Sequence, residues 1–82
     1  MSLHAEHAVV YMIDVFERIL IVAYNGNVPE KTVYDILDQR YGEWNNVEDY
    51  PETENYCCEE WMLIGLEELG IVYTPIYIGE ED

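Results

Sequence analysis

The sequence predicts a single, mainly α-helical domain in which three helices precede a short C-terminal β-strand or hairpin. A long apolar run opens the chain, and two later stretches place apolar residues at helical spacing. The last segment is rich in β-branched and aromatic residues. With 82 residues, half of them apolar, the chain is expected to form one domain over 1–82 with a frayed acidic tail at 79–82.

The first helix is predicted from Leu3 to Ala23, with Ser2 as its N-cap. At about 100° per residue, its polar residues fall within an arc of roughly 120° and leave the rest of the circumference apolar. These polar residues are Glu6, His7, Asp14, Glu17 and Arg18. A helix so widely apolar must be buried on several sides, by its own chain or by a second copy. Charged residues in mid-run argue against a membrane span, because each costs roughly 2.5–3.5 kcal/mol at mid-bilayer.

The second and third helices are ordinary amphipathic patterns. The second is predicted from Pro29, which suits a first helical turn, to Gly42. An aromatic and acidic loop over 43–55 separates it from the third, which is predicted from about Tyr56 to Leu69 and is closed by Gly70.

The segment from Ile71 to Ile78 is predicted to be extended. Pro75 cannot donate a hydrogen bond to a neighbouring strand. The segment is therefore expected to be an edge strand, or a tight hairpin that turns near Thr74 and Pro75.

The order of these elements, with Leu66-Glu67-Glu68-Leu69-Gly70-Ile71-Val72 at the junction, resembles the winged-helix branch of helix-turn-helix domains. In that superfamily a third helix commonly ends in a Leu-rich turn, and a Gly and an apolar strand then lead into the wing. The resemblance implies a winged-helix-like arrangement over roughly residues 4 to 79. The connection before the third helix is long and the wing is short, so a plain three-helix bundle with an edge strand is the alternative.

The charge of the chain is strongly segregated. The net charge is −15, and from Tyr41 onward the chain holds twelve acidic residues and no Lys or Arg. Direct binding of DNA or RNA needs Lys and Arg to displace counterions from the phosphates. We therefore expect no nucleic-acid contact by this chain itself.

Carboxylates fixed on a helix face can resemble a row of phosphates to a basic cleft, and long-range attraction would steer the two together. The chain resembles small acidic phage-encoded inhibitors of restriction, repair or CRISPR complexes in size and charge. Tyr and Trp, which are enriched at binding hot spots, lie among its acids. The predicted partner-binding residues are Glu43, Trp44, Glu48, Asp49, Tyr50, Glu52, Glu54, Glu59, Glu60, Trp61, Glu67 and Glu68.

The leading functional prediction is an acidic module that engages a basic nucleic-acid-binding protein, as an inhibitor by nucleic-acid mimicry. The alternative is a winged-helix-like regulatory or structural homodimer that pairs through the first helix and contacts no nucleic acid. A third interpretation is that the acids only keep an apolar protein in solution or reflect a salt-adapted source.

Catalysis and metal binding have weak support in the sequence. His4 and His7 with Glu6 offer metal-ligand chemistry, but they are expected in a solvated first turn. Cys57 and Cys58 are adjacent, so a disulfide between them would strain the backbone, and acidic neighbours do not activate a thiol. We predict no catalytic residue, no metal and no cofactor. Reduced cysteines and the lack of an export signal favour a cytoplasmic protein.

Overall fold

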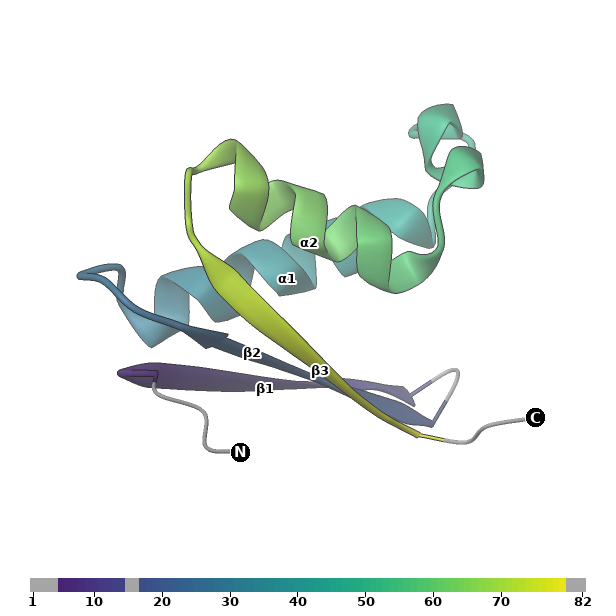
Figure 1. The fold of residues 1–82 in the computed structure, drawn as a ribbon. Helices are drawn as coiled ribbons and strands as arrows, with labels where there is room; N and C mark the ends of the chain where they lie inside the picture. Colours follow the sequence, from purple (N-terminus) through teal and green to yellow (C-terminus); the bar gives the residue numbers. More distant parts are fainter. Residues whose placement is uncertain (1–4, 15–16, 80–82) are drawn as a thin grey trace.

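The opening apolar run forms a β-hairpin. In the computed structural model, which describes residues 5–14 and 17–79, strand β1 (His7–Ile13) pairs antiparallel with strand β2 (Arg18–Tyr24), with His7 opposite Tyr24 and Ile13 opposite Arg18 (Figure 1). The predicted helix from Leu3 to Ala23 is therefore wrong. The expected N-cap at Ser2, the metal candidate His4 and residues 80–82 of the predicted tail lie outside the described residues. Gly79, the first residue of that tail, is not frayed but belongs to a strand and pairs with Arg18.

The hairpin escaped prediction because its strands are apolar on both faces. Val9, Tyr11 and Ile13 point into the core, whereas Val10 and Met12 between them are exposed but equally apolar. A strand with one solvent-exposed face usually alternates apolar and polar residues, and this alternation is missing here. The polar residues Asp14, Glu17 and Arg18 instead mark the connection between the strands, where Glu17 adopts a positive φ of 53°.

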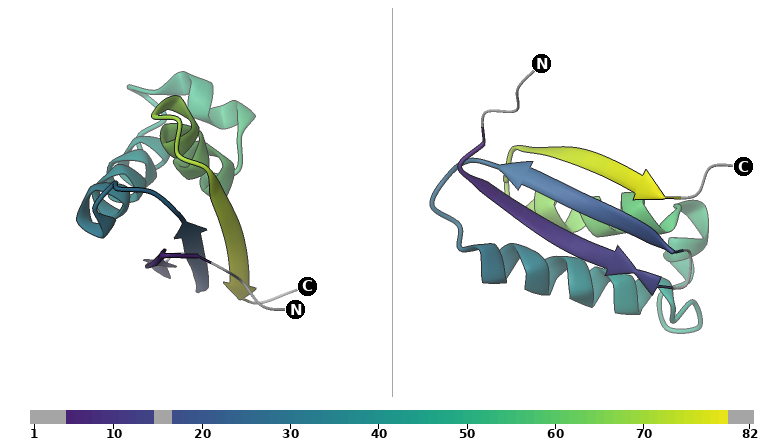
Figure 2. Two further views of the ribbon diagram at one scale, coloured as in Figure 1. Left: turned by 60° about the vertical axis from the view of Figure 1, so that its left-hand side comes forward. Right: turned by 90° about the horizontal axis from the view of Figure 1, so that it is seen from below.

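A three-stranded antiparallel sheet with two helices on one face makes up the fold. Strand β3 (Tyr73–Gly79) pairs with β2, with Tyr24 opposite Tyr73 and Arg18 opposite Gly79, so the strand order is β1-β2-β3. The predicted mainly α class is thus wrong, and so are its winged-helix-like and three-helix-bundle forms. The chain is a small α+β fold whose helices lie on one side of the sheet (Figure 2).

The two later helices follow the sequence patterns closely. Helix α1 spans Glu30–Trp44 with Pro29 as its N-cap, and it runs two residues past the predicted end at Gly42. Helix α2 spans Cys58–Glu68 and is followed by Gly70 at a φ of 76°. A short 3-10 helix, η2 (Pro51–Asn55), lies in the predicted loop between them.

The core fills the space between the helices and the inner face of the sheet. It contains Val9, Tyr11, Ile13, Leu20, Val22, Tyr24, Val33, Leu37, Cys58, Met62, Leu63, Leu66 and Ile71. The helices approach closely at Gly65, where an added Cβ would lie 2.9 Å from Cγ2 of Ile36. Neither helix in the described part of the chain is long and apolar enough to cross a membrane.

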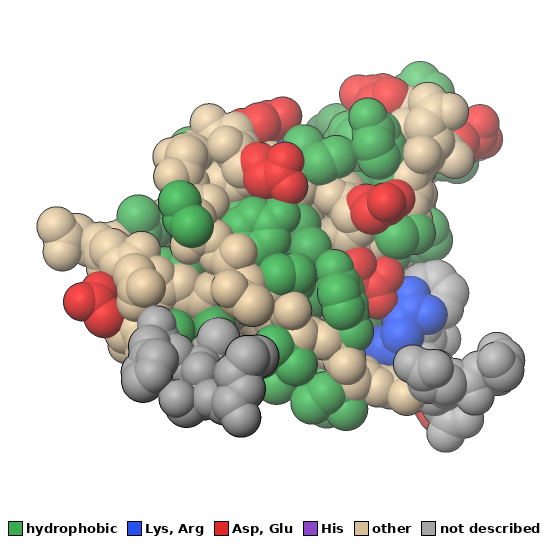
Figure 3. Space-filling view, viewed as in Figure 1, with side chains coloured by type: hydrophobic (Ala, Val, Ile, Leu, Met, Phe, Trp, Pro, Cys, Tyr) green, Lys and Arg blue, Asp and Glu red, His purple; other side chains and the backbone are tan. Residues whose placement is uncertain are grey.

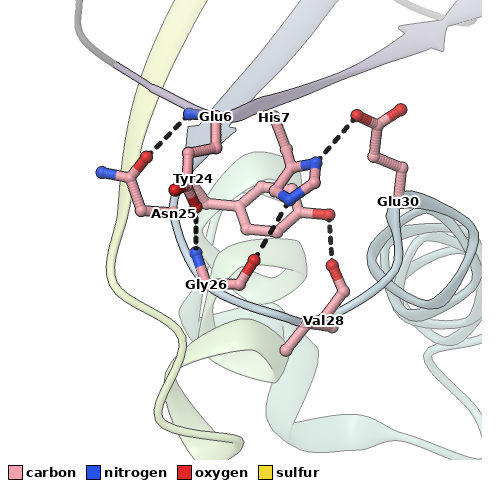
Figure 4. A network of polar contacts seen from close by, with 7 residues as sticks. All are labelled: Glu6, His7, Tyr24, Asn25, Gly26, Val28 and Glu30. Carbon is pink, nitrogen blue, oxygen red and sulfur yellow. Dashed lines mark hydrogen bonds and ion pairs between the residues drawn. The ribbon is translucent and has the colours of Figure 1, made fainter.

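A polar network ties the hairpin to the start of α1 (Figure 4). The His7 ring stacks on Tyr24 at 4.8 Å, and its Nδ1 and Nε2 atoms lie 3.1 Å from the Glu30 carboxylate and from the Gly26 carbonyl oxygen. The Tyr24 hydroxyl donates to the carbonyl of Val28 at 2.8 Å. Both ring nitrogens of His7 therefore face acceptors within the fold.

Candidate partner-binding groove between α2 and β3

Glu59 serves the fold, although the sequence placed it on the binding surface. It is only 7% exposed. Its two oxygens accept hydrogen bonds from Nε and Nη2 of Arg18 at 2.7 and 3.0 Å. This bidentate pair joins the start of α2 to the start of β2, and it raises the pKa of the Arg18 guanidinium. Glu59 therefore offers little to a partner.

Glu43 and Trp61 are also structural. Trp61 is buried, and its indole N–H donates to Oε1 of Glu43 at 3.1 Å. The guanidinium of Arg40 lies 4.1 Å above the Trp61 ring, and Arg40 Nε lies 3.9 Å from the Glu43 carboxylate. Trp44 is partly buried against the core and donates to the carbonyl of Tyr56 at 2.9 Å. These contacts hold α1, α2 and the segment between them together.

The other eight predicted residues are exposed and fall into two groups. The connection from α1 to α2 carries Glu48, Asp49, Tyr50, Glu52 and Glu54, and helix α2 carries Glu60, Glu67 and Glu68. Helix η2 and its flanks project beyond the end of the sheet (Figure 1). The structure thus keeps an acidic surface on the predicted segments, although it withdraws Glu59, Glu43 and Trp61 from it.

A groove of about 520 Å³ lies between α2 and β3 beside this acidic surface. Its lining consists of Tyr56, Glu60, Leu63, Ile64, Glu67, Tyr73, Pro75 and Tyr77. Figure 3 shows acidic side chains next to a hydrophobic surface in this region. Two carboxylates and three phenol rings thus meet over an apolar floor.

Both carboxylates of the groove are held in place by hydrogen bonds within the fold. The Tyr73 hydroxyl donates to Oε2 of Glu67 at 2.6 Å, and Oε1 of Glu60 accepts from the Cys57 amide at 3.1 Å. Burial, reinforced by Glu67, raises the pKa of Tyr73 to about 12, and burial also raises the pKa of Tyr77. Both phenols therefore remain protonated at neutral pH, and the formal charge of the groove comes from its two carboxylates.

Tyr56 connects the groove to a second hollow of about 260 Å³, which is lined by Trp44, Val47, Thr53, Glu54 and Tyr56. The Tyr56 ring is 5.5 Å from the Trp61 ring. A fixed aromatic ring therefore stands between the groove and the acidic segment that contains η2.

Six lining residues are absent from the predicted set: Tyr56, Leu63, Ile64, Tyr73, Pro75 and Tyr77. Tyr73, Pro75 and Tyr77 alternate along the predicted strand and therefore share one face of it. This spacing was visible in the sequence, but its value depended on knowing that the strand lies beside α2.

No protein-family model, curated protein or solved structure matches this chain. The chemistry of the groove and of its acidic surroundings is therefore the basis for assigning a function.

The remaining reactive side chains do not form an activated centre among the described residues. Cys57 is exposed and Cys58 is buried, and both are free thiols. Burial raises the pKa of the Cys58 thiol to about 12 and also raises that of Cys57, so neither is a thiolate at neutral pH. No three His, Cys, Asp or Glu side chains within residues 5–14 and 17–79 are placed to hold a metal ion.

Proposed function

We propose that this chain is an acidic protein-binding module that seats a basic segment of a nucleic-acid-binding partner, in the cytoplasm, and so competes with nucleic acid for that partner. The observation that carries the proposal is the groove in which Glu60 and Glu67 flank three tyrosines. Arginine suits such a site best, because its planar guanidinium stacks on phenol rings and pairs with carboxylates.

The charge around the groove supports a basic occupant. The chain has three cationic side chains, and each lies near a carboxylate of its own: Arg18 with Glu59, Lys31 with Asp35, and Arg40 with Glu43. Ion pairs within the fold therefore account for the positive charge. The acids of the connection between α1 and α2, residues 45–57, here called the η2 segment, and those of the groove keep a large negative excess. Such a field attracts positive surfaces and raises their rate of association at low salt.

We infer mimicry because the partner would normally bind nucleic acid in a basic cleft. A cleft that binds phosphates presents Arg and Lys to a row of negative charges. Carboxylates of the η2 segment and the groove offer negative charge to such a cleft, and the tyrosines add surfaces on which a guanidinium can stack. Occupation of that cleft by this chain would exclude nucleic acid.

The groove can be tested with a defined probe before any partner is known. An arginine-rich peptide and a lysine-rich peptide of equal charge are titrated into the protein, and backbone and tyrosine ring signals are followed by NMR. We expect the arginine peptide to bind more tightly and to shift the signals of Tyr56, Tyr73 and Tyr77. Equal binding of both peptides, with shifts spread evenly over the acidic surface, would show that binding is non-specific charge attraction and that the groove is not an arginine site.

A matched pair of double variants isolates the groove from net charge. Glu60→Gln with Glu67→Gln neutralises the groove, whereas Glu30→Gln with Asp35→Asn removes the same charge from α1. We expect the groove variant to weaken binding of the arginine peptide about three- to tenfold, because exposed ion pairs contribute roughly 0.2–1 kcal/mol each. The α1 variant should bind almost as the natural chain does.

Capture from a lysate of the source at low and high salt then identifies the partner class. We expect nucleic-acid-binding proteins that are released by salt and by added DNA or RNA. Captured proteins of another class, or binding that salt does not weaken, would refute mimicry. Failure of the folded protein to capture any nucleic-acid-binding protein would also count against mimicry.

A further inference from the structure

The outer face of the sheet, which points away from the helices, is apolar across its whole width. The strand register places three rows of residues on it: Ala8, Ala23 and Thr74; Val10, Ile21 and Ile76; and Met12, Ile19 and Ile78. Eight of the nine are apolar and none carries a charge, although 26% of the chain is charged. Val10, Met12 and Ile78 are 53%, 63% and 49% exposed, whereas Ala23 is only 2% exposed, so the accessible apolar surface lies mainly on the rows that contain Ile21 and Ile19.

Both helices lie on the opposite side of the sheet, and no helix or strand of the described residues covers the outer face (Figure 2). Antiparallel sheets with one solvated face normally place polar residues on that face. Contiguous apolar surface of this kind marks interaction sites in folded proteins. We infer that the outer face binds the outer face of a second copy of this chain.

Charge distribution favours a second copy over a partner of opposite charge. A basic protein would be drawn to the acidic helices and the η2 segment, and it would find no carboxylate on the outer face. A second copy presents an uncharged sheet of the same size and twist, and two such sheets can pack about 10 Å apart with their side chains interdigitated. A two-fold arrangement also keeps the acidic helical layers on the outside of the pair, where like charges are farthest apart.

The size of the face sets the strength of the dimer. Three strands at about 4.8 Å spacing and seven residues at about 3.3 Å rise give a face of roughly 300 Å² per copy. Because protruding side chains add to this area, two copies would together bury on the order of 700 Å² of surface. This total is less than the roughly 1,200 Å² at the lower end of standard interfaces. The dimer is therefore reversible, with a dissociation constant in the micromolar range.

Dimerisation would leave the groove open, because alternate residues of β3 serve the two surfaces. Tyr73, Pro75 and Tyr77 line the groove, whereas Ile76 and Ile78 point to the other side of the sheet. This inference does not depend on the proposed function.

Sedimentation equilibrium of the full chain from about 5 to 500 µM tests the inference. We expect a monomer–dimer equilibrium that shifts toward the dimer when salt rises from about 50 to 500 mM, because two copies of charge −15 repel less when screened. Met12→Glu and Ile78→Glu should each weaken the dimer at least tenfold. Val72→Glu adds the same charge at a residue that is 83% exposed but lies outside the sheet, and it should leave the dimer unchanged.

Folding of each variant is checked by circular dichroism and thermal melting. Ile78→Thr, which keeps a β-branched side chain in the strand, supplies a gentler variant that should weaken the dimer by a smaller factor. Methyl NMR signals of Val10, Met12 and Ile76 should move with protein concentration.

A monomer at 500 µM in high salt would overturn the inference. A dimer that persists in Met12→Glu and in Ile78→Glu would also overturn it, because that result would indicate pairing elsewhere, such as through the free edge of β1. A monomer that instead binds neutral phosphatidylcholine vesicles would assign the face to a lipid surface.

Discussion

Replacing Glu59 with glutamine should destabilise the protein by about 2 kcal/mol, whereas the same change at its neighbour Glu60 should cost less than about 0.5 kcal/mol. The Glu59 side chain is 10% exposed, and that of Arg18 is 33% exposed. A hydrogen bond to a charged group contributes roughly 1.5–3 kcal/mol when it is protected from water. Glutamine keeps one acceptor oxygen but turns an N–H₂ group toward the guanidinium, so one of the two bonds is lost. The exposure of Arg18 reduces the cost to the lower part of that range.

Thermal and urea denaturation measure this difference. For a domain of this size, about 2 kcal/mol corresponds to a fall in Tm of roughly 8–16 °C. Glu60→Gln is the matched control, because it removes the same charge from the adjacent residue, and its amide oxygen can still accept from the Cys57 amide. A double-mutant cycle with Arg18→Gln should give a coupling of at least about 1 kcal/mol.

A Glu59→Gln variant that melts within about 2 °C of the natural chain, or a cycle that shows no coupling with Arg18, would refute this role of the ion pair. The same pair of variants should behave in the opposite way in binding: folded Glu59→Gln should keep its affinity for an arginine-rich peptide, and Glu60→Gln should lose affinity. A variant such as Glu59→Lys therefore tests the fold rather than the acidic surface.

Two further predictions concern the packing of the helices. Gly65→Ala should lower the free energy of unfolding by about 1–2 kcal/mol in urea denaturation, because the new Cβ would lie 2.9 Å from Cγ2 of Ile36 and 3.0 Å from Cγ of Arg40. This clash outweighs the helix preference of Ala. A second change, Ile36→Ala, should remove most of the penalty, and a stabilised Gly65→Ala would contradict the close approach. Stability should also fall as pH rises above about 9. Burial raises the pKa of Cys58 from 9.0 to about 12, so the thiol ionises at lower pH in the unfolded chain than in the folded one. The loss should reach about 2 kcal/mol at pH 10.5, and Cys58→Ala should show a smaller loss between pH 8 and 10.5.

The sequence predicted those elements whose local residue preferences, such as Pro and Gly at their ends, agree with the tertiary structure. Pro29 precedes the start of α1, Gly70 follows the end of α2, and Pro75 lies in an edge strand, each for a backbone reason that is independent of tertiary structure. The opening run had no such signal for a strand, because both faces of the hairpin are apolar and the two-residue period disappears. The apolar surface of this run lies on the two faces of a sheet rather than around a helix.

The candidate site was predictable as a region and not as a set of contacts. Segregated charge located the acidic half of the chain. Glu59 and Glu60 are indistinguishable in that pattern, and what separates them is Arg18, which lies 41 positions earlier in the chain. The groove likewise depends on β3 lying beside α2, since only this arrangement brings Tyr73 and Tyr77 to the two carboxylates. Long-range pairing of this kind leaves no local signature.

Strand β3 connects the two proposed surfaces, and this connection has a consequence for binding strength. Its inner residues Tyr73 and Tyr77 belong to the groove, and its outer residues Ile76 and Ile78 belong to the apolar face. A dimer formed through the apolar face would carry two grooves, and a partner with two basic segments could then bind with an avidity that no single groove provides. Salt would act on the two surfaces in opposite directions, because it screens the attraction at the groove and the repulsion between copies. Binding of a bivalent basic partner should therefore weaken less steeply with salt than binding of a single arginine-rich peptide.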